Sequence, residues 1–374
     1  MAAETRMMKA RKFGARSLRL TRRDVLRTAA MSAVAAGGFT SPAIAQQRNV
    51  TFTLPWVPEG PNLIAFVAKA NGYWSKAGLN VDIAKGTGSV GAAQAIGNGQ
   101  FQFGLSAATA GLQQGALGLP LVQIACCSYD AFMSVITMSD SGVVAPKDLE
   151  GKKFGATTKS GEFPFLPAFA ANAGFDLGKV EILQVDPNVR QRLLIEKQVS
   201  AIFAPSVVPG YIANGFSPRI ILFSKFNLPL FGNALFTQQA LLAKEPEFCR
   251  AIAEGLNEAT KFVLLKPDQS LDIFFKANPE MELAKGAREQ TKLALDFFRY
   301  SVVHDAAKKN GIGYAPPAEY ATMTDLVMKY VAPDGKRPDL DKVVSNKFAG
   351  SVKLTDAEWS GLQSSFSDVT KLLT

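Results

Sequence analysis

The sequence predicts an α/β protein of two lobes. Short apolar segments typical of strands alternate with helical segments from residue 50 to residue 223, and this alternation favours parallel, helix-covered sheets. A second series of strands and helices begins near Pro146, although no Pro/Gly-rich linker precedes it. We therefore expect the chain to cross between the lobes at residues 135–139 and 234–238, with a ligand cleft between them.

The first lobe begins with a segment that alternates apolar and polar residues, as a half-buried strand does. Asn71-Gly72 ends the helix that follows, and Gly78 and Gly118 mark further turns. We expect strands at residues 50–54, 79–84, 101–105 and 121–125, and helices at residues 63–70, 90–96 and 108–117.

The second lobe shows the same alternation, after which the chain is mainly helical. We expect strands at residues 153–156, 180–184, 201–204 and 220–223, and helices at residues 164–173, 189–197 and 208–214. Further helices are expected at residues 248–265, 271–276, 284–300, 318–330 and 356–373. The predicted limits are 1–45 for an export signal, 46–137 and 237–374 for lobe 1 with the C-terminal helices, and 138–236 for lobe 2.

The N-terminal segment is predicted to be a twin-arginine signal peptide. Thr21-Arg22-Arg23-Asp24-Val25-Leu26-Arg27 matches the export motif, a weakly apolar stretch follows, and residues 41–45 end in a small-x-small cleavage pattern. The alternative is a basic arm on a cytosolic protein. Cleavage would leave Gln46 first, with no cysteine there for a lipid anchor, so we expect a soluble periplasmic protein.

The net charge of +9 is concentrated in this segment. Residues 1–45 contain nine basic and two acidic residues, whereas the other 329 residues contain 32 basic and 30 acidic ones. A nearly neutral body argues against nucleic-acid binding. Cys126, Cys127 and Cys249 are too few for a disulfide framework. The adjacent pair could form a strained vicinal disulfide, but small apolar residues at a strand end are favoured.

Several motifs resemble a known family. Trp56-Val57-Pro58 follows the first strand, and Ala68-Lys69-Ala70-Asn71-Gly72-Tyr73-Trp74 leads to Ala77-Gly78-Leu79-Asn80-Val81. Gly97-Asn98-Gly99 to Gly104, Pro146 to Lys152, Asn233 to Thr237, and Lys244 to Glu247 follow in order. Together they are similar to the SsuA/THI5-like (NMT1) family of periplasmic solute-binding proteins of ABC transporters, although Gln102 and Ser200 depart from its pattern.

This resemblance covers about residues 50–265 and implies a type II periplasmic binding protein, with two lobes, a hinge and a central ligand cleft. The family serves importers of sulfonates, nitrate, taurine, riboflavin and thiamine-pyrimidine precursors. The Trp-x-Pro opening is similar to the THI5-like branch, whose ligands are often flat heterocycles. The resemblance also brings an alternative, an enzyme of pyrimidine or thiamine-precursor metabolism.

A glycine-rich loop after the second strand is the first candidate site. Gly86, Thr87, Gly88 and Ser89 begin a GxGxxG pattern, but no acidic residue occurs from Gly86 to Leu117, which argues against dinucleotide binding. Its amides and hydroxyls could instead hold a ligand oxygen, or the loop could be a plain turn and helix cap. Trp56 could stack on a flat ligand or pack in the core.

The other candidates lie where strands end or lobes cross. Lys159 could neutralise an acidic ligand and Glu162 could accept from an amino group, although both could be solvated surface charges. Asp186 could equally cap a helix. The remaining candidates are Asn62, Ser106, Ala107, Thr109, Ser128, Tyr129, Ser160, Gly161, Asn188, Ser206 and Asn233.

Catalysis has little support in the sequence, because His304 is the single histidine and no His/Cys cluster could hold zinc. We expect no catalytic residue, no metal and no cofactor. The expected function is the monomeric substrate-binding component of an ABC importer. Its partners would be a small organic ligand, an inner-membrane permease with its ATPase, and the twin-arginine export machinery. The enzyme alternative predicts turnover that depends on His304 or a cysteine, and a ligand sensor without an importer is the third possibility.

Overall fold

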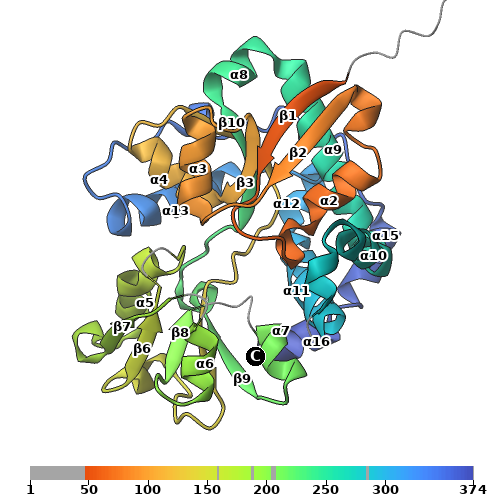
Figure 1. Cartoon of the computed structure of the whole chain (residues 1–374). Helices are drawn as coiled ribbons and strands as arrows, with labels where there is room; N and C mark the ends of the chain where they lie inside the picture. Colours follow the sequence, from red (N-terminus) through yellow and green to blue (C-terminus); the bar gives the residue numbers. More distant parts are fainter. Residues whose placement is uncertain (1–46, 158–159, 187–188, 204–207, 284–285, 374) are drawn as a thin grey trace, which may run out of the picture. The chain divides into compact units, whose positions relative to one another are not determined.

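The structure is a computed structural model that describes residues 47–157, 160–186, 189–203, 208–283 and 286–373, and its strands form two five-stranded sheets (Figure 1). The first sheet has the order β2-β1-β3-β10-β4, with β1 at Arg48–Thr53, β2 at Leu79–Ala84, β3 at Phe103–Ala107, β4 at Leu121–Cys126 and β10 at Asn233–Gln238. The second has the order β7-β6-β8-β5-β9, with β5 at Ser134–Met138, β6 at Lys153–Ala156, β7 at Glu181–Gln184, β8 at Ala201–Phe203 and β9 at Pro218–Leu222. The expected export signal lies outside the described residues.

Both sheets are mixed, whereas the strand–helix alternation predicted parallel ones. β1 runs parallel to β2 and β3, but β10 pairs antiparallel with β3 and β4. In the second sheet β6 runs parallel to β7 and β8, but β5 pairs antiparallel with β8 and β9. The chain leaves the first sheet after β4 and returns to it after β9. The strands that follow these two crossings, β5 and β10, are the ones that run antiparallel to their neighbours.

The first three α-helices of the first sheet are apolar segments followed by a glycine within two residues. α2 occupies Leu63–Ala70 as predicted, and Gly72, with φ of 72°, ends its last turn. The other helices of this layer are α3 at Ser89–Gly97, α4 at Ala108–Ala116, α8 at Gln239–Lys244, which was not predicted, and α9 at Pro246–Leu265. α2 and α9 pack against each other, and α3 packs on β3 (Figure 1).

The second sheet carries α5 at Leu166–Ala173, α6 at Arg190–Ile195 and α7 at Val208–Ala213. Its core is aromatic. The rings of Phe169 and Phe223 stack with centroids 4.5 Å apart, and those of Phe154 and Phe203 lie 4.7 Å apart. These buried phenylalanines hold the helical layer on the strands.

The C-terminal helices contact both layers. They are α10 at Pro267–Ala277, α11 at Ala287–Val302, α12 at Asp305–Asn310, α13 at Pro317–Tyr330, α14 at Leu340–Val343, α15 at Asp356–Gln363 and α16 at Ser367–Leu372. α13 packs on α4 and α11 packs on α7, so this segment spans from one layer to the other. No helix within the described residues has the length and apolar character that a membrane span requires.

The contact between Trp74 and α9 tests this packing. The indole Nε1 of Trp74 donates to the carbonyl oxygen of Ile252 at 3.1 Å, and a Cβ on Gly255 would lie 2.4 Å from its ring. We expect Gly255→Ala to destabilise the protein by about 1–3 kcal/mol through overpacking. Gly361→Ala in α15, where a Cβ meets nothing within 4 Å, should be neutral or stabilising by up to about 1 kcal/mol. Urea unfolding measures both, and equal midpoints would contradict the predicted clash.

Candidate functional site

The two segments that link the sheets are hydrogen-bonded to each other. The backbone N–H groups of Cys127 and Ser128 both donate to the carbonyl oxygen of Asn233, at 2.9 and 3.2 Å, and the N–H of Ala131 donates to the carbonyl oxygen of Leu230. The N–H of Asn233 in turn donates to the Ser128 hydroxyl at 2.9 Å. The two links therefore form one paired ladder.

A cavity of about 230 Å³ lies against this ladder, and we call it the interlobe pocket. Residues after strands of both sheets line it, together with residues of the links and of α11. They are Pro55, Trp56, Glu59, Pro61, Ser89, Ala107, Ser128, Asp130, Ala131, Phe132, Met133, Gly161, Glu162, Gly232, Asn233, Ala294, Phe297, Phe298 and Ser301. Its position at strand ends is where α/β proteins bind ligands.

Aromatic side chains give the pocket apolar walls. Trp56 follows β1, whereas Phe297 and Phe298 come from α11. Phe132 packs edge-on against Phe297 with ring centroids 5.4 Å apart. Its backbone has φ of 47°, a left-handed conformation that is strained for a bulky residue, and its N–H donates to Asp130 Oδ1 at 2.7 Å. These walls suit a flat ligand.

Among the described residues that line the pocket, the charged ones are all carboxylic acids: Glu59, Asp130 and Glu162. Burial raises the pKa of Glu59 to about 7; Arg190 opposes this rise and the nearby Glu162 adds to it. Burial also raises the pKa of Glu162, against the opposing effects of backbone and Ser160 hydrogen bonds and of Arg190. Burial likewise raises the pKa of Asp130. The pocket therefore disfavours negative charge on its own acids.

The structure brings seven of the sequence-predicted residues to this pocket: Trp56, Ser89, Ala107, Ser128, Gly161, Glu162 and Asn233. Asn62 and Ser106 are buried behind it and orient its walls. Asn62 Oδ1 accepts from Asn233 Nδ2 at 3.2 Å, and the Ser106 hydroxyl donates to the carbonyl oxygen of Ser89 at 2.7 Å.

The glycine-rich loop has a different position from the one we expected. The N–H groups of Gly86 and Gly88 donate to the carbonyl oxygens of Trp56 and Pro55, at 3.0 and 2.8 Å. A Cβ on Gly86 would lie 2.0 Å from the carbonyl oxygen of Leu54, so only glycine fits there. These two amides are thus bonded to the β1 end and not directed at a ligand. The side chain of Thr87 is exposed, and Thr87 does not line the pocket.

The remaining candidates are dispersed. Thr109 and Ser160 line a small adjoining pocket that Ser89 and Gly161 also reach. Asp186 is exposed, beyond the end of β7. Lys159, Asn188 and Ser206 lie outside the described residues.

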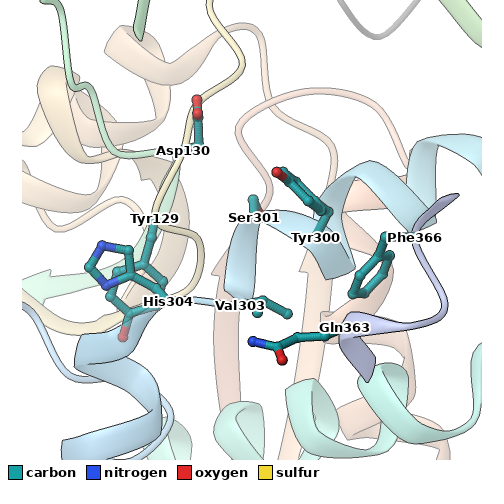
Figure 2. Close-up of a pocket in the computed structure, with 8 residues that line it drawn as sticks. All are labelled: Tyr129, Asp130, Tyr300, Ser301, Val303, His304, Gln363 and Phe366. Atoms are coloured by element: carbon teal, nitrogen blue, oxygen red, sulfur yellow. The ribbon is translucent and has the colours of Figure 1, made fainter. Parts of the chain in front are cut away.

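Tyr129 and His304 line a second cavity of about 380 Å³, which shares Asp130 and Ser301 with the interlobe pocket. The ring centroids of Tyr129 and His304 lie 4.6 Å apart. Figure 2 shows the two rings face to face, across the cavity from Tyr300 and Phe366. The Tyr129 hydroxyl donates to the carbonyl oxygen of Tyr314 at 2.6 Å. His304 Nδ1 accepts from the N–H of Ala306 at 3.1 Å and so caps α12. The histidine has a structural role that explains its position without catalysis.

The cysteines also have structural surroundings. Cys126, Cys127 and Cys249 are free and buried. Burial raises the pKa of Cys126 to about 12 and that of Cys127 well above its ordinary value. Because the thiolate is the nucleophile, neither thiol is activated here. The described residues contain no group of three or more His, Cys, Asp or Glu side chains that could hold a metal ion.

Sequence reasoning missed several pocket residues. Glu59 directly follows the Trp56-Val57-Pro58 motif, and Asp130 follows the Ser128-Tyr129 candidates, so both had a local signal. Phe297 and Phe298 lie in α11, whose amphipathic pattern predicts a buried face but not the cavity that the face meets.

The raised pKa of Glu59 predicts a pH-dependent stability. Between about pH 4.5 and pH 7 the unfolded carboxyl ionises before the folded one, so folding stability falls as the pH rises through this window. Glu59→Gln removes that loss, which is about 3 kcal/mol at most. We expect the variant to unfold about 3–6 °C above the wild type at pH 8 and at the same temperature near pH 4.5. Calorimetry measures this, with the exposed Glu258→Gln as control; a difference that does not change with pH would contradict it.

The sequence is similar to a known protein family and to several of its relatives. Residues 62–270 match the family model described as NMT1/THI5 like. A Brucella abortus protein named as a binding protein is 26% identical over 68% of this chain and 83% of its own. The 4-amino-5-hydroxymethyl-2-methylpyrimidine phosphate synthase of Schizosaccharomyces pombe is 22% identical over 68% of this chain and 76% of its own.

Solved structures give the fold. The periplasmic aliphatic sulphonate-binding protein SsuA of Escherichia coli superposes with a TM-score of 0.61 at 14% identity, over 79% of this chain and 96% of its own. The protein therefore has the two-lobed α/β fold of periplasmic binding proteins. Since the family model matches more than half of its residues, the chain belongs to the NMT1/THI5-like family.

Proposed function

We propose that this protein is the periplasmic substrate-binding component of an ABC importer and captures a small organic solute with a flat aromatic or heterocyclic ring. The observation that carries the proposal is the interlobe pocket, which is lined by residues after strands of both sheets and has the aromatic walls Trp56, Phe132 and Phe297. A flat ring there would be covered on its faces by aromatic side chains and anchored at its edge by polar groups.

Lobe closure follows from this placement of the walls. Trp56 and Ser89 belong to the layer of the first sheet, whereas Gly161 and Glu162 follow β6 of the second. A ligand that contacts both sets binds the closed arrangement more tightly than the open one and shifts the population towards it. A permease can then distinguish the loaded protein from the empty one by its shape.

Export and partners complete the proposal. The twin-arginine motif and the cleavage pattern at residues 41–45 support export to the periplasm, where SsuA, a structural relative, acts. We propose a monomer that delivers its solute to an inner-membrane permease with an ATPase. The buried cysteines and the capping role of His304 support binding without turnover.

Ligand binding is tested by a thermal-shift panel of pyrimidines, flavins, aromatic acids, sulfonates, nitrate and bicarbonate. A ligand at about 100 times its dissociation constant should stabilise the protein by about 2.7 kcal/mol. Among the three tryptophans, Trp56 lines the pocket whereas Trp74 and Trp359 are buried elsewhere. A ligand should therefore change the tryptophan fluorescence of the wild type but not of Trp56→Phe.

The Trp56→Ala variant should bind the same ligand about tenfold more weakly, a loss of about 1.4 kcal/mol. Trp359→Ala in α15, at a tryptophan that does not line the pocket, serves as the control. Consumption of the bound compound would instead support the enzyme alternative, and ligand binding that Trp56→Ala leaves unchanged would contradict this pocket.

Export is tested separately. Replacing Arg22 and Arg23 together by lysine should leave uncleaved precursor in the cytoplasm, because the motif requires the arginine pair. Arg27→Lys, outside that pair, should be exported normally. Fractionation followed by N-terminal sequencing should find Gln46 first in the wild type, and equal export of all three would rule out the twin-arginine route.

A further inference from the structure

We propose that the interlobe pocket selects a ligand whose ring carries a positive charge or several N–H donors, held between Glu59 of one lobe and Glu162 of the other, and that it rejects sulfonates and other anions. This inference rests on the proposed function and names the chemical class of its solute. It concerns charge alone, so it can fail while the proposed binding function holds.

The first support is the charge of the lining. Glu59, Asp130 and Glu162 line the pocket, and within the described part of the chain no basic side chain lines it with them. A partly enclosed cavity weakens the solvent screening of these charges. An anion would face three acids, whereas a cation would be attracted by each of them.

The second support is where the two glutamates come from. Glu59 stands at the start of a short 3₁₀ helix, Gly60–Asn62, after β1, and Glu162 stands at the start of another, Phe163–Phe165, after β6. The two equivalent strand-end positions thus each present one carboxyl group to the same cavity. When both are ionised they repel each other, and a cationic ligand between them replaces that repulsion by two attractions.

The third support is a guanidinium group that acts on both glutamates. Arg190 begins α6 of the second lobe and acts electrostatically on both Glu59 and Glu162. Its Nε is buried and has no hydrogen-bond partner among the described residues, so the arginine is not committed to a close pair through that atom. One cation shared by two acids leaves negative charge for the ligand to neutralise. Arg190 also acts electrostatically on Tyr211.

The aromatic walls restrict the shape of this cation. Trp56 and Phe297 can cover the faces of a planar ring, while the carboxylates accept N–H groups at its edge. An amino-substituted heterocycle or an aryl amidinium has this combination of a flat apolar face and edge donors. A flexible alkyl ammonium has the charge but would leave the aromatic walls uncovered.

Proton release should accompany binding of such a ligand. Because the pKa of Glu59 is raised to about 7, part of its population is protonated at neutral pH and must ionise to receive a cation. The affinity for a permanently charged amidinium should therefore rise with pH from about 5.5 to 8, by up to about tenfold per unit below the pKa. The affinity for a neutral ring should not follow this slope.

Three compounds of the same shape test the inference: benzamidine, benzamide and benzenesulfonate, which are cationic, neutral and anionic. Their dissociation constants are measured at millimolar concentrations by calorimetry on the full-length processed protein. The wild type should bind benzamidine at least about tenfold more tightly than benzamide, and benzenesulfonate least. Glu59→Gln and Glu162→Gln should each remove most of the benzamidine preference, whereas the exposed Glu258→Gln should keep it.

The outcomes separate the two levels of the proposal. Equal, Trp56-dependent binding of benzamidine and benzamide would overturn the charge inference and leave the proposed function standing. Tightest binding of benzenesulfonate would also overturn it. If either glutamine variant fails to fold, as circular dichroism would show, the pH slope of benzamidine binding to the wild type decides, and a flat slope overturns the inference. Binding of none of the three rings would overturn both levels.

Discussion

The backbone pairing between the two links is the interaction on which the pocket depends. Asn233 accepts from two N–H groups of the outgoing link, and a Cβ on Gly232 would lie 2.1 Å from the Ser128 hydroxyl, so the links can approach only because residue 232 is glycine. This ladder continues into β10 on one side and precedes β5 on the other. It therefore fixes the distance between the two sets of strand ends that line the interlobe pocket.

Next to this ladder the chain contains a strained backbone and carboxyl groups whose desolvation lowers the stability of the folded state. Phe132 holds a left-handed backbone, and Glu59 and Glu162 are partly buried and raise the cost of each other's ionisation. Such strain and desolvation typically mark functional sites, because the rest of the fold must over-determine them. A ligand that forms ion pairs or hydrogen bonds with these acids would relieve part of this penalty. Binding therefore gains free energy that a pocket without strain or buried acids would not supply.

Most helices and strands, and part of the candidate site, could be predicted from the sequence because their signals are local. Periodicity and glycine turns define α2, β2 and β6 to the residue, and the strand-end rule placed Trp56, Ser89 and Glu162 at the pocket. The direction of each strand in its sheet could not be predicted, because an antiparallel strand such as β10 has the same local sequence pattern as a parallel one. The glycine-rich loop was ambiguous for a related reason, since its amides pair with the backbone at Trp56, a partner distant in sequence.

Fold similarity and pocket chemistry carry different information here. The same lobes in SsuA belong to a protein named for sulphonates, yet at 14% identity that likeness shows the fold alone. Loops after strands tolerate substitution while the sheets keep their register, so one frame can present basic groups to an anion or acids to a cation. The sign of the charge at Glu59 and Glu162 is therefore a property of this chain, and it is the feature that most directly constrains which solute the shared fold can hold.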